Sequence, residues 1–493
     1  MDQIQLSQKA LPRISEQIPC PNYDRTSLTS GIIHIGVGGF HRAHQAFYLH
    51  QLLKKNNDLD WGILGVGLRK GDRKMFEILN RQDFLYTLIQ QHPDGTMESE
   101  VMGAMTGMLL AENATESIID RLAHPETKIV SLTITEGGYN IHPHTGAFNF
   151  EDADIQHELQ HPYQPRTIFG FLTAGLRKRQ MAGLPAFTVL SCDNIQHNGD
   201  VARKMLLAFV QRQDPDLAGW IEEAVCFPNS MVDRITPVTT EADVAYLQDT
   251  HALTDEWPVI CEPFIQWVVE DRFSNGRPAL EEVGVQFVPD VTPYEKMKIR
   301  LLNAGHSVLG IPGAIHGHAS INACMDDPVF ARFMRKFMDE EATPVLDPIE
   351  GIDLTAYKDS LEARFANPNI KDHVSRICSE SSAKLPKFLL PTLQENLAEG
   401  GSIQYASFIL AAWCYYSDQE MDEQQRPLEI IDAQKQALHD AARHTSEDPL
   451  RFLRLAEIFG SLHENDRFTR TYTDMVQAIY ASQDIRKLMA EMV

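Results

Sequence analysis

The chain has 493 residues, more than one hydrophobic core usually organises, so we expect two domains. Its 44 Lys and Arg residues against 68 Asp and Glu residues give a net charge of −24. Such a charge repels phosphate backbones and anionic lipid surfaces. The composition therefore argues against nucleic acid and against a membrane as partners.

Neither a membrane anchor nor a targeting segment is visible. The longest nearly unbroken apolar run, 406–416, is shorter than the roughly 18 residues that span a bilayer. The first residues, MDQIQLSQKALPRISEQ, lack the apolar core of a secretory signal. The seven cysteines are scattered without a C-x-x-C pair, which supports neither a disulfide framework nor a thiolate zinc site. We expect a cytoplasmic protein.

The first half of the chain alternates short apolar runs with segments of helical length, as in a mostly parallel sheet with crossover helices. The segment after Asn198 carries apolar residues at helical spacing, so a helix follows the last of the expected strands. The expected strands are Ile32–Ile35, Gly62–Val66, Lys128–Ile134 and Ala186–Leu190.

From about Thr292 the pattern changes to successive helices. One begins at Asp327-Pro328, an N-cap followed by proline at the first helical position, and another covers 452–459 and ends at Gly460. The predicted fold is α/β, with a Rossmann-type, mostly parallel sheet domain at 1–290 followed by a mainly α-helical domain at 291–493. The junction at 287–293 is short and contains proline, so we expect the domains to meet in a tight cleft.

A glycine-rich turn follows the first expected strand. Gly36, Gly38 and Gly39 permit a tight turn and a close approach of a pyrophosphate, and a helix N-terminus after them offers free N–H groups. His41 stands where the usual G-x-G-x-x-G has its third glycine. A dinucleotide site is favoured, with a methyltransferase-like site or a structural turn as the alternatives.

The second expected strand ends close to Asp72, where an acid binds the ribose 2′-hydroxyl of NAD. Arg69, Lys70 and Arg73 stand beside it. They either accommodate the 2′-phosphate of NADP or form a solvated loop surface. NAD is the preferred cofactor, and NADP stays open.

The helix that begins near Thr292 carries the candidate chemistry. Thr292, Pro293 and Glu295 fit a capping box at its start. On a regular α-helix, Glu295, Lys298, Asn303 and His306 share one broad face, with Asn303 about 140° around from Lys298. A solvated stripe is the alternative, but apolar residues on the opposite face favour a buried helix.

Oxidation of an alcohol needs a base, and Lys298 can serve if desolvation lowers its pKa toward neutrality. Asn303 and Asn194, the latter just past a strand end, can donate N–H groups to a developing alkoxide. Tyr294 and Lys298 also form Y-x-x-x-K, the tyrosine-base motif of short-chain dehydrogenases. The length of the chain and the different glycine turn argue against that family.

The histidines do not predict a metal site. His34, His41 and His44 cluster in sequence without an acid or cysteine to complete a ligand set. His316 and His318 are expected to be structural. We therefore expect no metal.

Five motifs together resemble the mannitol dehydrogenase family of long-chain polyol dehydrogenases, from about residue 20 to beyond residue 460. The glycine at 137 is more typical of its mannitol branch than of its uronate reductases. The motifs are G-V-G-G-F-H-R-A-H-Q at 36–45, S-L-T-I-T-E-G-G-Y at 131–139, S-C-D-N with H-N-G at 191–199, M-V-D-R-I-T-P at 231–237 and K-x-x-x-x-N-x-x-H at 298–306.

The resemblance implies metal-independent NAD(P) chemistry in a monomer. It assigns Lys298 as base, Asn194 and Asn303 as alkoxide donors, His306 as a substrate-orienting group and Glu295 as a proton relay. It places Phe40 and Asp233 at the cofactor, beside Gly36, Gly38, Gly39 and Asp72. It places Arg376 and Lys384 on substrate hydroxyls. Related members often carry two adjacent acids where this chain has Gly71-Asp72, which weakens the case for strict NAD selectivity.

The implied reaction interconverts a linear polyol and its ketose, with D-mannitol, D-fructose and NAD as the first expectation. D-arabinitol, sorbitol or a hexuronate are alternative substrates on the same fold. A nucleotide-binding protein without turnover is the remote alternative, and the intact lysine, asparagine and histidine set argues against it.

Overall fold

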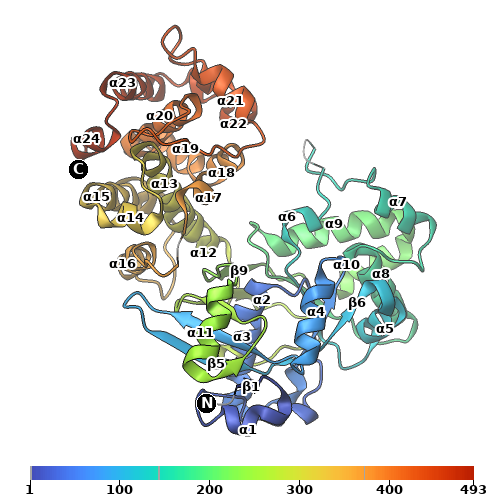
Figure 1. The fold of residues 1–493 in the computed structure, drawn as a ribbon. Coiled ribbons are helices and arrows are strands. Elements are labelled where there is room, and N and C mark those ends of the chain that lie inside the picture. The colour runs from blue at the N-terminus through green and yellow to red at the C-terminus, as the bar shows by residue number, and fades with distance from the viewer. Residues whose placement is uncertain (1–2, 143–144, 371) are drawn as a thin grey trace. The chain divides into compact units, whose positions relative to one another are not determined.

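The computed structural model describes residues 3–142, 145–370 and 372–493. The chain divides into two compact units, Met1–Thr292 and Pro293–Val493 (Figure 1). The first unit mixes strands and helices, and in the described part of the second unit extended pairing is confined to isolated bridges.

A five-stranded parallel sheet organises the first unit, with strand order β6-β3-β2-β7-β8. This confirms the predicted Rossmann-type sheet. Its crossovers leave β2 in opposite directions, so the strand order reverses between β2 and β7, and open α/β sheets bind ligands at such a point. The strands are β2 (Ile32–Ile35), β3 (Ile63–Gly67), β6 (Met105–Leu110), β7 (Ile129–Leu132) and β8 (Thr188–Ser191).

The two faces of this sheet belong to different apolar cores. Ile33 and Ile35 of β2 pack into one core with helices α5, α8, α9 and α10. Ile32 packs into the other, together with α3 and the strands that hold Tyr86 and Trp267. Alternate residues thus serve opposite faces, as the pleat of a doubly covered strand requires.

Three smaller sheets were not anticipated from the sequence. Their orders are β1-β10, β11-β4-β5 and β13-β12-β9. Each contains a parallel pair formed by distant segments, and such pairing leaves little local signal. The strands are β1 (Ile4–Gln5), β4 (Tyr86–Gln91), β5 (Met97–Met102), β9 (Ser230–Asp233), β10 (Leu253–Thr254), β11 (Val259–Cys261), β12 (Gln266–Glu270) and β13 (Gln286–Val288).

The helices of the first unit include the predicted one after Asn198, which is α9. They are α1 (Leu11–Ile14), α2 (Gly39–Ala43), α3 (Gln45–Asn56), α4 (Asp72–Arg81), α5 (Ala111–Ala123), α6 (Thr135–Gly138), α7 (Ala153–Gln160), α8 (Ile168–Met181), α9 (Asn198–Gln213), α10 (Pro215–Ala224) and α11 (Glu241–His251).

The second unit is helical, as predicted, and begins within α12. Two π-helical turns, η5 (Lys298–Asn303) and η6 (Met338–Ala342), interrupt its helices. The α-helices are α12 (Thr292–Met297), α13 (Ala304–His316), α14 (Ile321–Asp326), α15 (Pro328–Phe337), α16 (Leu354–Phe365), α17 (Val374–Cys378), α18 (Ser381–Phe388), α19 (Leu390–Glu399), α20 (Gln404–Asp418), α21 (Lys435–Ala442), α22 (Ala456–Phe459), α23 (Asp466–Ser482) and α24 (Ile485–Ala490).

Local signals in this unit were confirmed at one helix and wrong at another. The Asp327 carboxylate caps α15 by accepting from the backbone N–H of Val329, as the Asp-Pro start predicts. The single helix expected over 452–459 is instead a short 3₁₀ turn and α22, separated at Leu455, whose ψ of 82° is not helical. The apolar run at 406–416 lies in the buried core helix α20. Among the described residues we find no helix long and apolar enough to cross a membrane.

Two buried histidines stack beneath the glycine turn. The ring of His34, in β2, lies 3.4 Å from the ring of His41, in α2, and the rings are nearly parallel. Hydroxyl groups of Ser131 and Thr133 lie 2.9 Å from the two ring nitrogens of His34. Burial lowers the pKa of His34 to about 3 and the pKa of His41 well below its usual value. Both rings are therefore neutral in the folded protein near pH 7.

This burial predicts a loss of stability in acid. Because both histidines have lower pKa values folded than unfolded, their contribution is present above pH ~6.5 and falls as the pH drops below it, down to about pH 3 for His34. For His34, the free energy of unfolding should fall by about 1.4 kcal/mol for each pH unit over that range. Denaturant unfolding from pH 7 to pH 4 should show a smaller loss for His34→Gln than for the wild type. His124→Gln, a more exposed histidine, serves as control, and equal slopes for His34→Gln and the wild type would contradict the account.

Candidate functional site

The glycine turn lies at the carboxyl end of β2 and can take only glycine at its first position. Gly36 has φ of +97°, and a Cβ there would lie 2.1 Å from the carbonyl oxygen of Thr133. A Cβ on Gly38 or Gly39 would meet no atom closer than 3.6 Å. The open side of the turn thus leaves room for a close ligand, and α2 begins there. Phe40, half-buried, stacks on His44.

His41 explains why the third glycine of the usual motif is dispensable here. Its ring lies inward on His34 and is 1% exposed, so it fills the space beneath the turn. A glycine at this place normally lets the helix pack closely on the strand. Here two stacked imidazoles form that contact.

Asp72 is the first residue of α4, directly after β3. Its carboxylate accepts a hydrogen bond from the backbone N–H of Arg69 at 2.9 Å, which fixes it at the strand end. The neighbouring cations have partners of their own: Arg73 pairs with Glu112 at 2.7 Å, and Arg69 donates to the carbonyl of Ile134. Lys70 is exposed. The arrangement favours a neutral ribose hydroxyl over a phosphate at this place.

The carboxyl ends of β7 and β8 are tied together by Asp193. Its carboxylate accepts from the backbone N–H groups of Ile134 and Thr135 and from the Tyr139 hydroxyl, at 2.7–3.1 Å. Burial raises the pKa of Asp193, against these hydrogen bonds. The next residue, Asn194, is exposed at the same edge of the sheet. Sequence analysis did not consider Asp193, although it stands within the S-C-D-N motif.

Two residues in the loops after β7 and β8 have a strained backbone. Thr135 has φ of +62° and His197 has φ of +50°, values that residues with side chains rarely adopt. Such residues gather at functional sites. Asp233 is buried at the end of β9, in the small sheet beside the core of the first unit.

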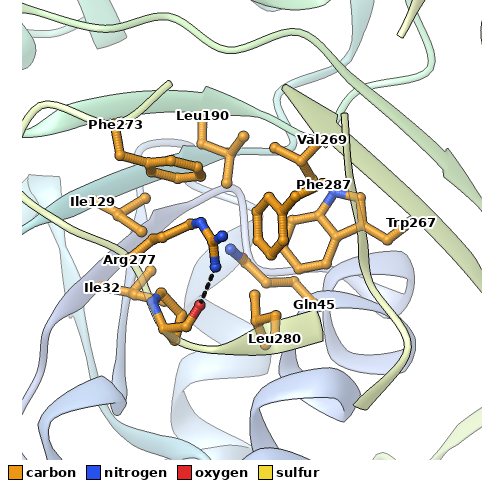
Figure 2. A pocket seen from close by; sticks show the side chains of 11 residues that line it. Ile32, Gln45, Ile129, Leu190, Trp267, Val269, Phe273, Arg277, Leu280 and Phe287 are labelled. Carbon is orange, nitrogen blue, oxygen red and sulfur yellow. Dashed lines mark hydrogen bonds between the residues drawn. The ribbon is translucent and has the colours of Figure 1, made fainter. Parts of the chain in front are cut away.

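The first unit also has a small apolar cavity, which is shown in Figure 2. Ile32 and Ile129, the first residues of β2 and β7, line it, together with Gln45 and Leu190. Arg277 closes it by lying 3.4 Å over the ring of Phe287. Its volume is about 10 Å³, the minimum for one water molecule, so it cannot hold a nucleotide or a sugar.

In the second unit, the helix with the candidate base begins at Thr292. The Asp290 carboxylate accepts from the backbone N–H and hydroxyl of Thr292, at 2.8 and 2.6 Å. The capping-box pattern did not reveal this acceptor, because the pattern assigns the cap to Thr292 itself. Glu295 and Lys298 are both buried, with 4% and 7% exposure. The expected buried helix is therefore present, and a solvated stripe is wrong for these two residues.

The regular α-helix assumed from the sequence is wrong between Lys298 and Asn303. These residues form the π-helical turn η5, and the N–H of Ala304 reaches back five residues to the carbonyl of Ile299. A π-turn has more residues per turn than an α-helix, because its backbone bonds join residues five apart. The turn therefore rotates Asn303 back toward the side of the helix that carries Lys298, where an α-helix would leave the two about 140° apart. Asn303 Oδ1 is buried and has no hydrogen-bond partner among the described residues.

One acidic residue links two of the predicted substrate-side groups, and a third lies beside them. Asp372 Oδ2 lies 3.6 Å from Nε2 of His306, and Asp372 Oδ1 accepts from Nε of Arg376 at 2.9 Å. Lys384 donates to the backbone carbonyls of Arg376 and Ile377. Burial lowers the pKa of Lys384. Sequence analysis did not single out Asp372.

Helix packing supports this grouping. The helix α13 packs on α17, and η5 packs on α18. A Cβ on Gly310 of α13 would lie 2.8 Å from Ile377, so glycine permits the close approach of α17. Arg300 of η5 is buried and donates to Thr392 and Glu395, which fixes the turn from its other side. Helices far apart in sequence thus hold Lys298, His306 and Arg376 in one unit.

Tyr294 is poorly placed to act as a base. Its hydroxyl donates to the backbone carbonyl of Glu350 at 3.3 Å. Burial raises its pKa. The phenolate that the short-chain mechanism requires is therefore disfavoured.

Comparison with known proteins identifies relatives over nearly the whole chain. A mannitol 2-dehydrogenase of Neosartorya fischeri is 43% identical over 97% of each chain, and one of Cereibacter sphaeroides is 42% identical over 97% of this chain and 100% of that one. Among solved structures, the Pseudomonas fluorescens mannitol 2-dehydrogenase in ternary complex with NAD and D-mannitol is 44% identical, with a TM-score of 0.86 over 99% of each chain. A substrate-free D-sorbitol dehydrogenase is 36% identical, with a TM-score of 0.91 over 98% of this chain and 100% of that one.

The family profiles cover both units. The mannitol dehydrogenase Rossmann domain matches residues 30–282, and the mannitol dehydrogenase C-terminal domain matches residues 290–480. The resemblance seen in the motifs is thereby confirmed, and this chain belongs to the mannitol dehydrogenase family.

Proposed function

We propose that this protein is an NAD-dependent oxidoreductase that interconverts a linear polyol and its ketose, with D-mannitol and D-fructose as the first pair. The observation that carries the proposal is the 44% identity, over 99% of each chain, to a protein solved with NAD and D-mannitol. The glycine turn, Asp72 and the buried Lys298 supply the groups that this chemistry requires.

Lys298 acts as the general base in this proposal. It takes the proton of the substrate hydroxyl onto Nζ, while the C–H electron pair leaves carbon and the carbonyl forms. NAD, held by the glycine turn and Asp72, would supply the acceptor for the hydride that carries this electron pair. A base must be neutral to accept a proton, and burial favours the neutral form of an amine. Glu295, buried one turn earlier, is the proposed relay that returns the proton to solvent.

Asn303 and Asn194 stabilise the alkoxide that develops on the substrate oxygen. The π-turn rotates Asn303 toward the side of the helix that carries Lys298, and the amide Nδ2 of Asn303 is the group that would donate to the oxyanion. An amide that donates to the oxyanion more strongly than to the ground-state hydroxyl lowers the barrier. Asn194 offers the same group from the carboxyl edge of the sheet.

His306, Arg376 and Lys384 hold the hydroxyls of the chain. His306 and Arg376 are oriented by Asp372, so a carboxylate that touches both sets their relative position. Charged donors form strong hydrogen bonds to hydroxyl oxygens. A polyol presents several such oxygens, which suits a cluster of donors.

For the cofactor site we propose contacts from Gly36, Gly38, Gly39 and Phe40 to the pyrophosphate side, with Asp72 on the ribose and Asp233 close to the cofactor. We further propose that the protein acts as a monomer, which size-exclusion chromatography with light scattering checks directly.

Sorbitol is the second candidate substrate, because the D-sorbitol dehydrogenase structure aligns with a TM-score of 0.91. A panel of D-mannitol, sorbitol, D-arabinitol, D-fructose and hexuronates, followed by nicotinamide absorbance, separates the candidates. We expect the highest kcat/KM with D-mannitol and D-fructose. Absence of turnover with every member of the panel would overturn the enzyme assignment.

Replacing the proposed base tests the mechanism. Lys298→Ala should lower kcat by about 10²-fold or more, because general-base catalysis is lost. Tyr294→Phe, four residues before Lys298, is the matched variant and should retain most of the activity. A larger loss in Tyr294→Phe than in Lys298→Ala would support the tyrosine-base mechanism instead. Both are measured by steady-state kinetics with D-mannitol.

Cofactor choice depends on Asp72. Asp72→Ser removes the carboxylate that accepts from a ribose hydroxyl and repels a 2′-phosphate. The ratio of kcat/KM for NAD to that for NADP should fall by about 10- to 100-fold, the worth of a hydrogen bond to a charged group. Asp94→Ser, an exposed acid in the same unit, should leave the ratio unchanged. An unchanged ratio in Asp72→Ser would remove Asp72 from the cofactor site.

A further inference from the structure

A second cluster of polar side chains lies in the second unit, at the far end of α13. His316, His318 and Asp327 each offer a ligand atom, and these atoms lie within 4.8 Å of one another. His316 is the last residue of α13, 13 residues beyond Asn303, or roughly 20 Å along the helix at 1.5 Å per residue. The cluster is therefore separate from the proposed catalytic groups.

Each of the three residues has a ligand position left. Nδ1 of His316 is paired with Oε2 of Glu423 at 2.9 Å, which leaves its Nε2 for coordination. Nε2 of His318 is buried and has no hydrogen-bond partner among the described residues. The Asp327 carboxylate accepts from the N–H of Val329 and twice from Arg486. A carboxylate has about four acceptor positions, so one remains.

The backbone explains how the two histidines come together. Gly317 ends α13 with φ of +94°, and this left-handed residue turns the chain so that the N–H of His318 reaches the carbonyl of Gly313. The rings of His316 and His318 then lie 5.0 Å apart, and both contact Phe330. Phe330 therefore forms an apolar wall on one side of the cluster, and the ligand atoms lie on the other side. Such an arrangement shields a bound ion from water.

The carboxylate of Glu423 behind His316 matches the carboxylate–histidine arrangement that orients metal-binding imidazoles.

We propose that His316, His318 and Asp327 form a binding site for a first-row divalent cation, Zn²⁺ in the first place. Three protein ligands leave the fourth position for water. The ion would brace the C-terminal end of the chain, because Arg486 of α24 binds Asp327 and the N–H of Ile485 donates to Glu423 at 2.6 Å. The proposal is independent of the proposed dehydrogenase activity.

The test uses the full-length, untagged protein, treated with a chelator and then dialysed. Titration with Zn²⁺ in a calorimeter should give one site per chain, and Co²⁺ should give the visible absorption of a four-coordinate ion. At a hundredfold excess over Kd, Zn²⁺ should raise the Tm of the 493-residue chain by roughly 2–3 °C. Polyol oxidation should be unchanged, since the site is remote from Lys298.

Variants decide whether these three residues are the ligands. His318→Ala and Asp327→Asn should abolish binding and the Tm rise, and Glu423→Gln should weaken binding by about 10- to 100-fold. His444→Ala, a surface histidine paired with Glu447, is the control and should bind as the wild type does. Circular dichroism of the metal-free variants checks that they are folded. His316→Gln replaces any variant that is not folded. The proposal is wrong if the wild type binds no Zn²⁺ at micromolar concentrations, or if folded ligand variants bind it unchanged.

Discussion

The π-turn at Lys298–Asn303 is the constraint on which the proposed chemistry of the second unit depends. Its i to i+5 bonding adds residues to each helical turn, so side chains five positions apart lie nearer to one side of the helix than they would in an α-helix. Such turns are less stable than regular helix, and here the buried Arg300 holds the turn through Thr392 and Glu395. The turn lies where the proposed base and the proposed oxyanion donor would act on one substrate oxygen.

In the first unit, the topology of the sheet brings the proposed site residues together. Parallel strands end at a common edge, so segments distant in sequence converge there without any local signal between them. Gly36 follows β2, Asp72 follows β3, and Asn194 follows β8. Asp193 then fixes the loops after β7 and β8 to each other by accepting three hydrogen bonds. Burial of the Asp193 carboxylate costs desolvation free energy. The fold tolerates this cost because the carboxylate sets the shape of the sheet edge.

Sequence patterns predicted elements well where the signal is local. The strand Ile32–Ile35 and the helix start at Asp327-Pro328 were predicted as found, because apolar runs and caps act over a few residues. The helix over 452–459 was wrong, since its apolar spacing did not reveal the break at Leu455. Asp290, Asp193 and Asp372 were missed because a single aspartate has many structural roles, and only its partners distinguish them.

The sequence alone determined the fold class, the glycine turn and the set of residue types, because these depend on periodicity and on motifs of contiguous residues. Only the tertiary structure decided how those residues meet. It replaced an α-turn by a π-turn at Lys298, set His41 against His34 in place of a glycine, and brought His316 and His318 to Asp327. These outcomes depend on packing between segments far apart in the chain, and no local pattern carries that information.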